Sequence, residues 1–139
     1  MERSSDDLIH LSLDLSRLFR RTMECEAGDA NFLQLRALSI IADHKRLAMT
    51  EFARAMSISR STATEFADRL MHSGFILRLM EPENRRTVLI ALTPLGQEIV
   101  ERGMRRKKRL LGKLFAGLSV ADRAHLERIL HLLLQSIQA

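Results

Sequence analysis

The chain has 139 residues, 46% of them hydrophobic and only two of them proline, which suits one helical domain and excludes a wholly disordered chain. No apolar run approaches the roughly 18 residues of a membrane-spanning helix, so we expect no membrane association. The net charge of +5 suits nucleic acid as a partner, and residues 44–92 are the electropositive part, with eight basic and five acidic side chains.

Two amphipathic helices are predicted first. Leu8, Leu11 and Leu15 belong to an apolar series with steps of three and four, which predicts a helix that reaches about Met23. After the stretch CEAGDAN, a second helix has an apolar face formed by Phe32, Leu35, Leu38 and Ile41. Residues 42–46 then form a polar connection.

Two short helices joined by a tight turn come next. The stretch TEFARAM predicts a helix under three turns long that Thr50 can cap, and residues 57–59 form a three-residue turn. Ser59 can cap a second helix, which ends near Gly74 and has an apolar face of Ala63, Phe66, Ala67 and Leu70. This spacing predicts a helix-turn-helix, whose second helix enters the major groove of DNA.

A β-hairpin is predicted after the helix-turn-helix. Residues 75–80 and 87–92 alternate in the manner of strands, and the loop EPENRR lies between them. Arg85 and Arg86 stand near the tip of this hairpin, which therefore forms a wing.

Two helices complete the chain. Thr93 and Pro94 begin a long helix that reaches about Gly117, and the spacing Ser119-x-x-Asp122 begins the last helix. The last helix is apolar on several sides, so we expect a second chain to cover it. The predicted fold is mainly α with a small β-hairpin wing, a winged helix-turn-helix in the order α-α-α-α-β-β-α-α.

The central run of the chain closely resembles the MarR family of bacterial regulators. It reads LQLRALSIIADHKRLAMTEFARAMSISRSTATEFADRLMHSGFILRLMEPENRRTVLIALTPLG, about half the chain. The resemblance implies an intertwined helical homodimer that binds a palindromic duplex-DNA operator, in which residues 1–29 and 93–139 dimerise and residues 30–92 form the DNA-binding lobe. Three positions depart from the family, which commonly has Asp where Glu81 and Asn84 stand and often a basic residue where Glu65 stands.

The resemblance and the predicted elements together assign the DNA-binding and dimer residues. The recognition-helix candidates are Ser59, Arg60, Ser61, Thr62, Thr64, Glu65 and Arg69. Asp68 and Arg69 also suit pairing with neighbouring elements. The wing candidates are Arg78, Asn84, Arg85 and Arg86. The dimer-interface candidates are Leu8, Leu11, Leu15, Leu126, Ile129, Leu130, Leu133 and Ile137.

The family resemblance also implies a small effector, for which an aromatic or acidic compound is the expected chemistry. The candidate cleft lies between the second helix and the dimer helices, near Phe19, Met23, Phe32, Leu35 and Arg36. Arg36 would be the partner of a carboxylate. Simple core packing of the same residues is the alternative interpretation.

Other function classes are disfavoured. The single cysteine, Cys25, excludes an internal disulfide, and the acidic start is unlike a secretory signal, so we expect a cytoplasmic protein. The scattered histidines predict no metal site, and the absence of catalytic motifs predicts neither an enzyme nor a cofactor. Two alternatives remain open: a dimeric protein-interaction module that has lost DNA binding, and a thiol sensor based on Cys25. The family's hydroperoxide sensors activate their cysteine with tyrosines, and this chain has none.

Overall fold

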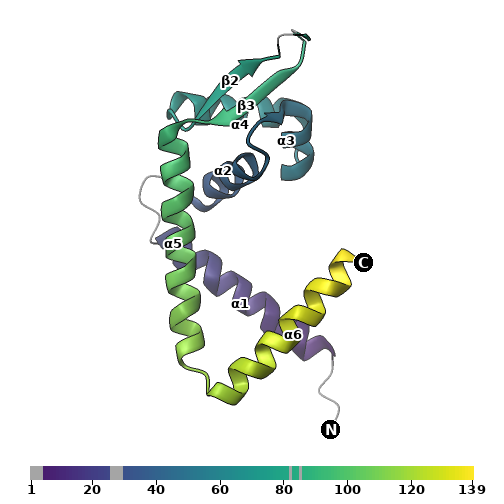
Figure 1. The fold of residues 1–139 in the computed structure, drawn as a ribbon, viewed down its shortest axis with the longest axis vertical. Helices are drawn as coiled ribbons and strands as arrows, with labels where there is room; N and C mark the ends of the chain where they lie inside the picture. Colours follow the sequence, from purple (N-terminus) through teal and green to yellow (C-terminus); the bar gives the residue numbers. More distant parts are fainter. Residues whose placement is uncertain (1–4, 26–29, 82, 85) are drawn as a thin grey trace. The chain divides into compact units, whose positions relative to one another are not determined.

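The computed structural model describes residues 5–25, 30–81, 83–84 and 86–139, without the side chains of Glu24 and Cys25. Its contacts divide the chain into two compact units, Met1–Met104 and Arg105–Ala139. The elements in chain order are α1 (Ser5–Cys25), α2 (Phe32–His44), β1 (Leu47–Ala48), α3 (Met49–Met56), α4 (Arg60–His72), β2 (Ile76–Met80), β3 (Val88–Leu92), α5 (Pro94–Ala116) and α6 (Val120–Gln138) (Figure 1). This order confirms the mainly helical winged helix-turn-helix, whereas the division into a lobe and a dimerisation region stays a prediction.

Side-chain caps define where several helices begin. Asn31 and Gln34 form a reciprocal capping box at α2, in which the Asn31 carboxamide accepts from the backbone of Gln34 at 2.8 Å. Ser59 and Ser119 cap α4 and α6, as predicted from the sequence. The predicted cap at Thr50 is wrong, because α3 begins at Met49 and its first turn has no side-chain cap.

The sheet has three antiparallel strands in the order β1-β3-β2. The predicted hairpin is formed by β2 and β3, with Arg78 directly opposite Ile90. The additional strand β1 pairs Leu47 with Ile90 from the other side and lies between the predicted connection of residues 42–46 and the next predicted helix, where the sequence predicted no element. Two residues are too few to produce the alternation from which a strand is predicted.

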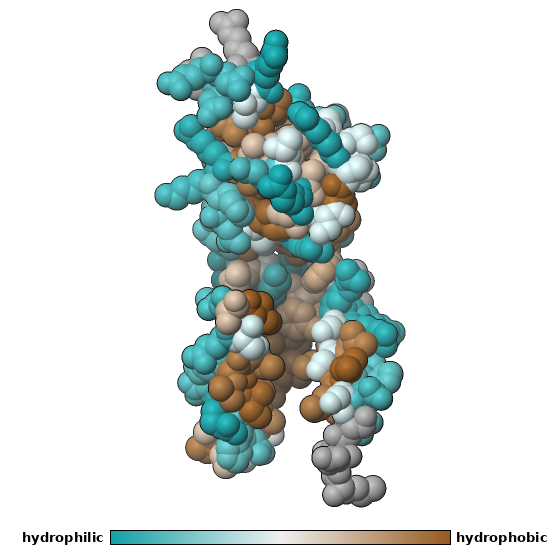
Figure 2. Space-filling model, turned by 90° about the vertical axis from the view of Figure 1, so that its right-hand side faces the viewer, coloured by the Kyte–Doolittle hydropathy of each residue, from teal (hydrophilic) through white to brown (hydrophobic). Residues whose placement is uncertain are grey.

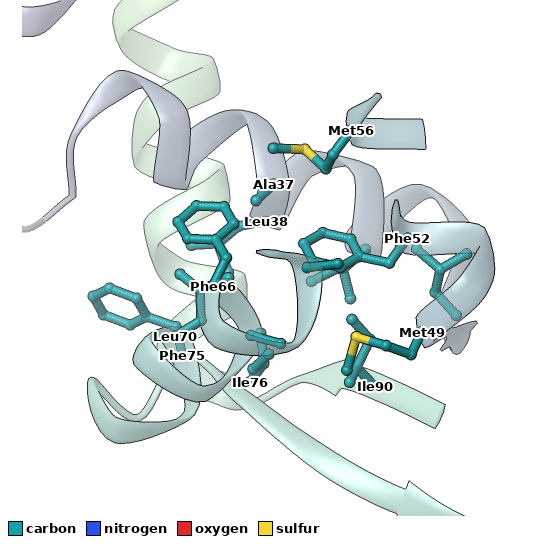
Figure 3. Close-up of a cluster of buried hydrophobic side chains, with 14 of the residues drawn as sticks. Ala37, Leu38, Met49, Phe52, Met56, Phe66, Leu70, Phe75, Ile76 and Ile90 are labelled. Atoms are coloured by element: carbon teal, nitrogen blue, oxygen red, sulfur yellow. The ribbon is translucent and has the colours of Figure 1, made fainter. Parts of the chain in front are cut away.

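The hydrophobic core of the first unit lies between α2, α3, α4 and the sheet. Figure 3 shows Phe52, Phe66, Leu38 and Ile90 turned toward one another from these four elements. The rings of Phe52 and Phe66 stack with their centroids 6.4 Å apart. This core fixes α3 and α4 against each other, so the polar face of α4 is left outside.

The start of α5 packs tightly against the segment between α4 and β2. The Thr93 hydroxyl donates to the carbonyl of Gly74 at 2.6 Å and accepts from the backbone N–H of Gly96 at 3.1 Å. The backbone N–H of Thr93 donates to the carbonyl of Phe75. A Cβ at Gly96 would lie only 2.0 Å from that same carbonyl oxygen, so only glycine fits here.

The two terminal helices carry apolar side chains that the single chain leaves exposed. On α1, Leu8 and Leu11 are each 64% exposed, and no residue of α6 is buried. Figure 2 shows brown, apolar side chains on the exposed surface of each helix. Within the second unit, Phe115, Leu126, Leu130 and Leu134 line a groove of about 360 Å³.

Candidate nucleic-acid interface

The helix-turn-helix is formed by α3, residues 57–59 and α4. Ser57 adopts the left-handed conformation, with φ 56° and ψ 42°, and its backbone N–H donates to the last turn of α3. Ile58 is half-buried in the turn, and the predicted inner face of α4 is buried. The turn and the buried face together determine which side of α4 meets solvent.

The outer face of α4 is polar and accessible. Ser59, Arg60, Ser61, Thr62, Glu65 and Arg69 are exposed, and Thr64 is half-buried. Among the described residues, Arg60 and Glu65 have no side-chain hydrogen bond or ion pair in the structure. The Arg69 guanidinium lies over the Phe66 ring, 6.0 Å from its centroid, and still has access to solvent.

Some of the side chains predicted to contact DNA form hydrogen bonds within α4. The Ser59 hydroxyl donates to the hydroxyl of Thr62 at 2.8 Å and accepts from the Thr62 backbone N–H at 3.2 Å. The Thr64 hydroxyl donates to the carbonyl of Arg60 at 2.9 Å, which leaves its oxygen able to accept. Ser59 and Thr62 therefore stabilise the first turn, whereas Ser61 and Thr64 present hydroxyl oxygens on the outer face.

The wing is the hairpin of β2 and β3, which extends away from the helices of the first unit (Figure 1). Asn84 organises its turn, because the Asn84 side-chain oxygen accepts from the backbone N–H of Arg86 at 3.1 Å and the Asn84 carbonyl accepts from Thr87. Arg86 is exposed. The predicted wing contact Arg85 lies outside the described residues.

Arg78 has a partner that the sequence prediction did not assign to it. Its guanidinium donates to the Asp68 carboxylate at 3.1 Å, which joins β2 to α4. Asp68 was expected to pair with a neighbouring element, and this ion pair confirms that expectation.

The residues of the predicted effector cleft differ in exposure. Met23 and Leu35 are buried, Phe19 and Phe32 are half-buried, and Arg36 is exposed. Arg20, which the sequence prediction missed, lies over the Phe32 ring, 5.0 Å from its centroid. Arg20 of α1 thus meets α2 at an aromatic side chain, and an effector cleft here stays a prediction.

The described residues offer neither a metal site nor a membrane-spanning helix. That part of the chain has no group of three or more histidine, cysteine, aspartate or glutamate side chains that could hold a metal ion. None of the helices described is long and apolar enough to cross a membrane. The side chain of Cys25 lies outside the described part, so a thiol role is not tested.

Comparisons with known proteins match both the sequence and the fold. The MarR family model matches residues 31–88, from the cap of α2 to the first residue of β3. The chain is 32% identical over 108 residues to YfiV of Bacillus subtilis, an uncharacterized HTH-type transcriptional regulator, and the match covers 69% of this chain and 68% of YfiV. It is 29% identical over 106 residues to the transcriptional repressor MprA of Escherichia coli, covering 76% of this chain and 60% of MprA. The crystal structure of wild-type apo MarR from E. coli has a TM-score of 0.77 and 25% identity, and the match covers 96% of this chain and 99% of that chain.

Proposed function

Because this chain belongs to the MarR family of DNA-binding transcriptional regulators, we propose that it acts as a homodimeric repressor that occupies a palindromic operator. The observation that carries the proposal is the outer face of α4, where accessible polar side chains lie opposite a buried apolar face in a helix-turn-helix. The printed description of MprA as a transcriptional repressor supports the direction of regulation.

Within this proposal, α4 reads bases. Arg60, Ser61, Thr64 and Glu65 carry the donors and acceptors of its outer face. Arginine suits the acceptor edge of guanine, and a glutamate accepts from the amino group of cytosine. Arg69 is the remaining cation of this face, and its packing over Phe66 restricts its direction. Ser59 and Thr62 act indirectly, because their hydroxyls hold the first turn of α4 in shape.

The wing contributes phosphate or minor-groove contacts. Arg86 is exposed, and Asn84 holds the backbone beside it through the turn. Arg85 precedes Arg86 in the sequence and is expected to add a second cation to this contact. Replacing Arg86 by Gln should weaken binding to all duplexes and reduce the slope of log affinity against log salt by about 0.9 for each lost contact, or about 1.8 for a dimer.

The proposed dimer is formed by the helices at the two ends of the chain. The exposed leucines of α1 include Leu8, Leu11 and Leu15, and the apolar side chains of α6 are equally uncovered in one chain. Leu126 and Leu130 line the groove of the second unit, whereas Ile129, Leu133 and Ile137 add further exposed apolar surface. Monomeric proteins rarely expose so large an apolar surface, and a second copy would remove it from water.

Release of the operator by a small effector is a separate part of the proposal. Phe19 on α1 and Phe32 at the start of α2 are half-buried, and Arg36 is an exposed cation on α2. These side chains suit an aromatic acid, whose ring would meet the phenyl groups and whose carboxylate would meet Arg36. Screening aromatic acids for release of bound DNA tests it, and failure of all of them favours simple packing.

The experiment that tests the main proposal is selection of bound sequences from a random duplex library at low salt. We expect enrichment of a palindrome whose half-site centres are about 10 base pairs apart. Transcription in vitro from a promoter with the enriched site should then fall as protein is added. A chain that binds no duplex even at low salt would contradict the DNA-binding proposal and favour the protein-interaction alternative.

A further inference from the structure

The backbone of Arg78 lies in β2, and its side chain leaves the strand face that packs on the helices. Arg78 lies directly opposite Ile90 in the antiparallel pairing of β2 with β3, and residues opposite each other share one face of a sheet. Ile90 is fully buried, and Ile76, two residues before Arg78 on the same strand face, is only 3% exposed. Arg78 therefore extends from the face that packs on the core, and not from the outer face of the hairpin.

The guanidinium of Arg78 contacts the recognition helix, α4. It donates to the Asp68 carboxylate at 3.1 Å, between side chains that are 44% and 57% exposed. Asp68 follows Thr64 by four residues, so the two occupy the same stripe of α4, one turn apart. The ion pair thus joins the wing to the stripe that carries the proposed base-reading residues.

Asp68 also matters because of its charge. A bare carboxylate on the outer face of α4 would repel the phosphates of a bound duplex, whereas its pairing with Arg78 neutralises it locally. Arg78 has to remain beside Asp68 to do this, so its guanidinium is held against α4.

We propose that Arg78 is a positioning residue, which holds the wing against the recognition helix through Asp68 and masks the Asp68 carboxylate from DNA. This inference rests on the proposed function and revises the expectation that Arg78 itself contacts DNA. Exposed ion pairs add little to the free energy of unfolding, so its effect should appear in the geometry and charge of the interface.

The test is a double-mutant cycle with wild type, Arg78→Gln, Asp68→Asn and the double variant, measured for affinity to the selected operator across salt concentrations. In the wild-type background, Asp68→Asn should weaken operator binding, because the wing loses its tether. In the Arg78→Gln background the same change should strengthen binding, because it removes an unmasked carboxylate. This reversal of sign is the expected result, and the double variant, which removes both charges of the pair, should keep the salt slope of wild type.

Two further variants serve as controls for the double-mutant cycle. Arg78→Lys keeps a cation beside Asp68 and should retain most of the operator affinity. Arg102→Gln is the matched control, because it removes an arginine from the exposed Arg102–Glu98 pair on α5, whose side chains are 44% and 53% exposed. The control should alter neither the operator preference nor the wing. All variants should unfold at the same denaturant midpoint as wild type, which excludes a general loss of fold.

Hydrogen exchange of the β2 and β3 amides, measured without DNA, makes the inference independent of the proposed function. Exchange should be faster in Arg78→Gln than in wild type or Arg102→Gln. Unchanged exchange together with additive effects in the cycle would show that Arg78 does not tether the wing, and a salt slope reduced by about 1.8 for the dimer in the double variant would show that Arg78 touches phosphate. Either result would overturn the inference. A wild type that binds no duplex contradicts the proposed function instead, while the exchange measurement still decides whether Arg78 tethers the wing.

Discussion

Gly96→Ala tests the close packing that joins α5 to the segment after the recognition helix. The added Cβ would lie 2.0 Å from the carbonyl oxygen of Phe75 and 2.9 Å from its carbonyl carbon. The oxygen would have to move by about 1 Å or more to restore van der Waals contact, since carbon–oxygen contacts shorter than about 3 Å are repulsive. That oxygen accepts the backbone N–H of Thr93 at 3.0 Å, so the same shift also strains a hydrogen bond.

The size of the effect follows from these two costs. Overpacking a well-packed site costs about 1–3 kcal/mol, and an impaired backbone hydrogen bond adds about 1 kcal/mol. Alanine recovers up to about 1 kcal/mol of helix propensity relative to glycine. We therefore expect Gly96→Ala to lower the free energy of unfolding by about 1–3 kcal/mol.

Two other glycines of α5 provide matched controls. A Cβ at Gly103 would meet only the end of the flexible Leu35 side chain, at 3.0 Å, and a Cβ at Gly112 would meet no atom of the chain within 4 Å. Urea unfolding at one fixed protein concentration should therefore rank Gly112→Ala as the most stable variant, Gly103→Ala as intermediate and Gly96→Ala as the least stable. Light scattering should establish that all three keep the same oligomeric state. A Gly96→Ala protein as stable as the Gly112→Ala protein would refute the packing described for Thr93 and Phe75.

Three further substitutions are expected to change the stability measured by the same urea unfolding. Asn31→Ala removes the capping box of α2 and should cost about 1 kcal/mol, whereas Asn31→Ser should retain most of the cap; equal losses would contradict the cap. Ser57→Gly should stabilise the protein by roughly 0.5–1 kcal/mol, because Ser57 has φ 56° in the turn before α4, and destabilisation would argue against that conformation. Leu38→Ala should cost about 2–5 kcal/mol, because Leu38 is fully buried in the core, and a loss below 1 kcal/mol would mean that the core is loosely packed there.

The elements that could be predicted from the sequence are those with a long periodic pattern or a distinct cap. The apolar face of α4, its cap at Ser59 and the start of α5 after Thr93 all appear where the sequence predicts them. The strand β1 and the start of α3 could not be predicted in the same way. β1 has two residues and owes its conformation to pairing with β3, which is distant in sequence. The adjacent α3 begins at Met49, one residue before the hydroxyl that suggested a cap.

The candidate site shows a different limit. Alternation along β2 places Ile76 and Arg78 on one strand face. It does not predict which face of the strand packs on the helices, or which side chain of another element lies close enough to pair with Arg78. Only the register with β3 and the position of α4 reveal that Arg78 meets Asp68. Residue type is equally ambiguous, because asparagine and serine are residue types that contact DNA in many proteins and that also favour caps and turns.

The exposed leucines of α1 and the apolar side chains of α6 show what periodicity does and does not establish. Apolar residues repeated every three or four positions, as at Leu8, Leu11 and Leu15, indicate that one face of the helix is apolar and favours burial. The repeat does not identify the surface that covers this face. The core around Phe52 and Leu38 is closed without these side chains, so the lobe needs no contribution from them for its own burial. The apolar pattern of these two helices therefore has to be explained by another surface. The proposed partner is a second copy of this chain, because that copy carries the same exposed apolar helices. A two-fold symmetric pair would also hold two copies of α4 at one fixed spacing, as a palindromic site requires.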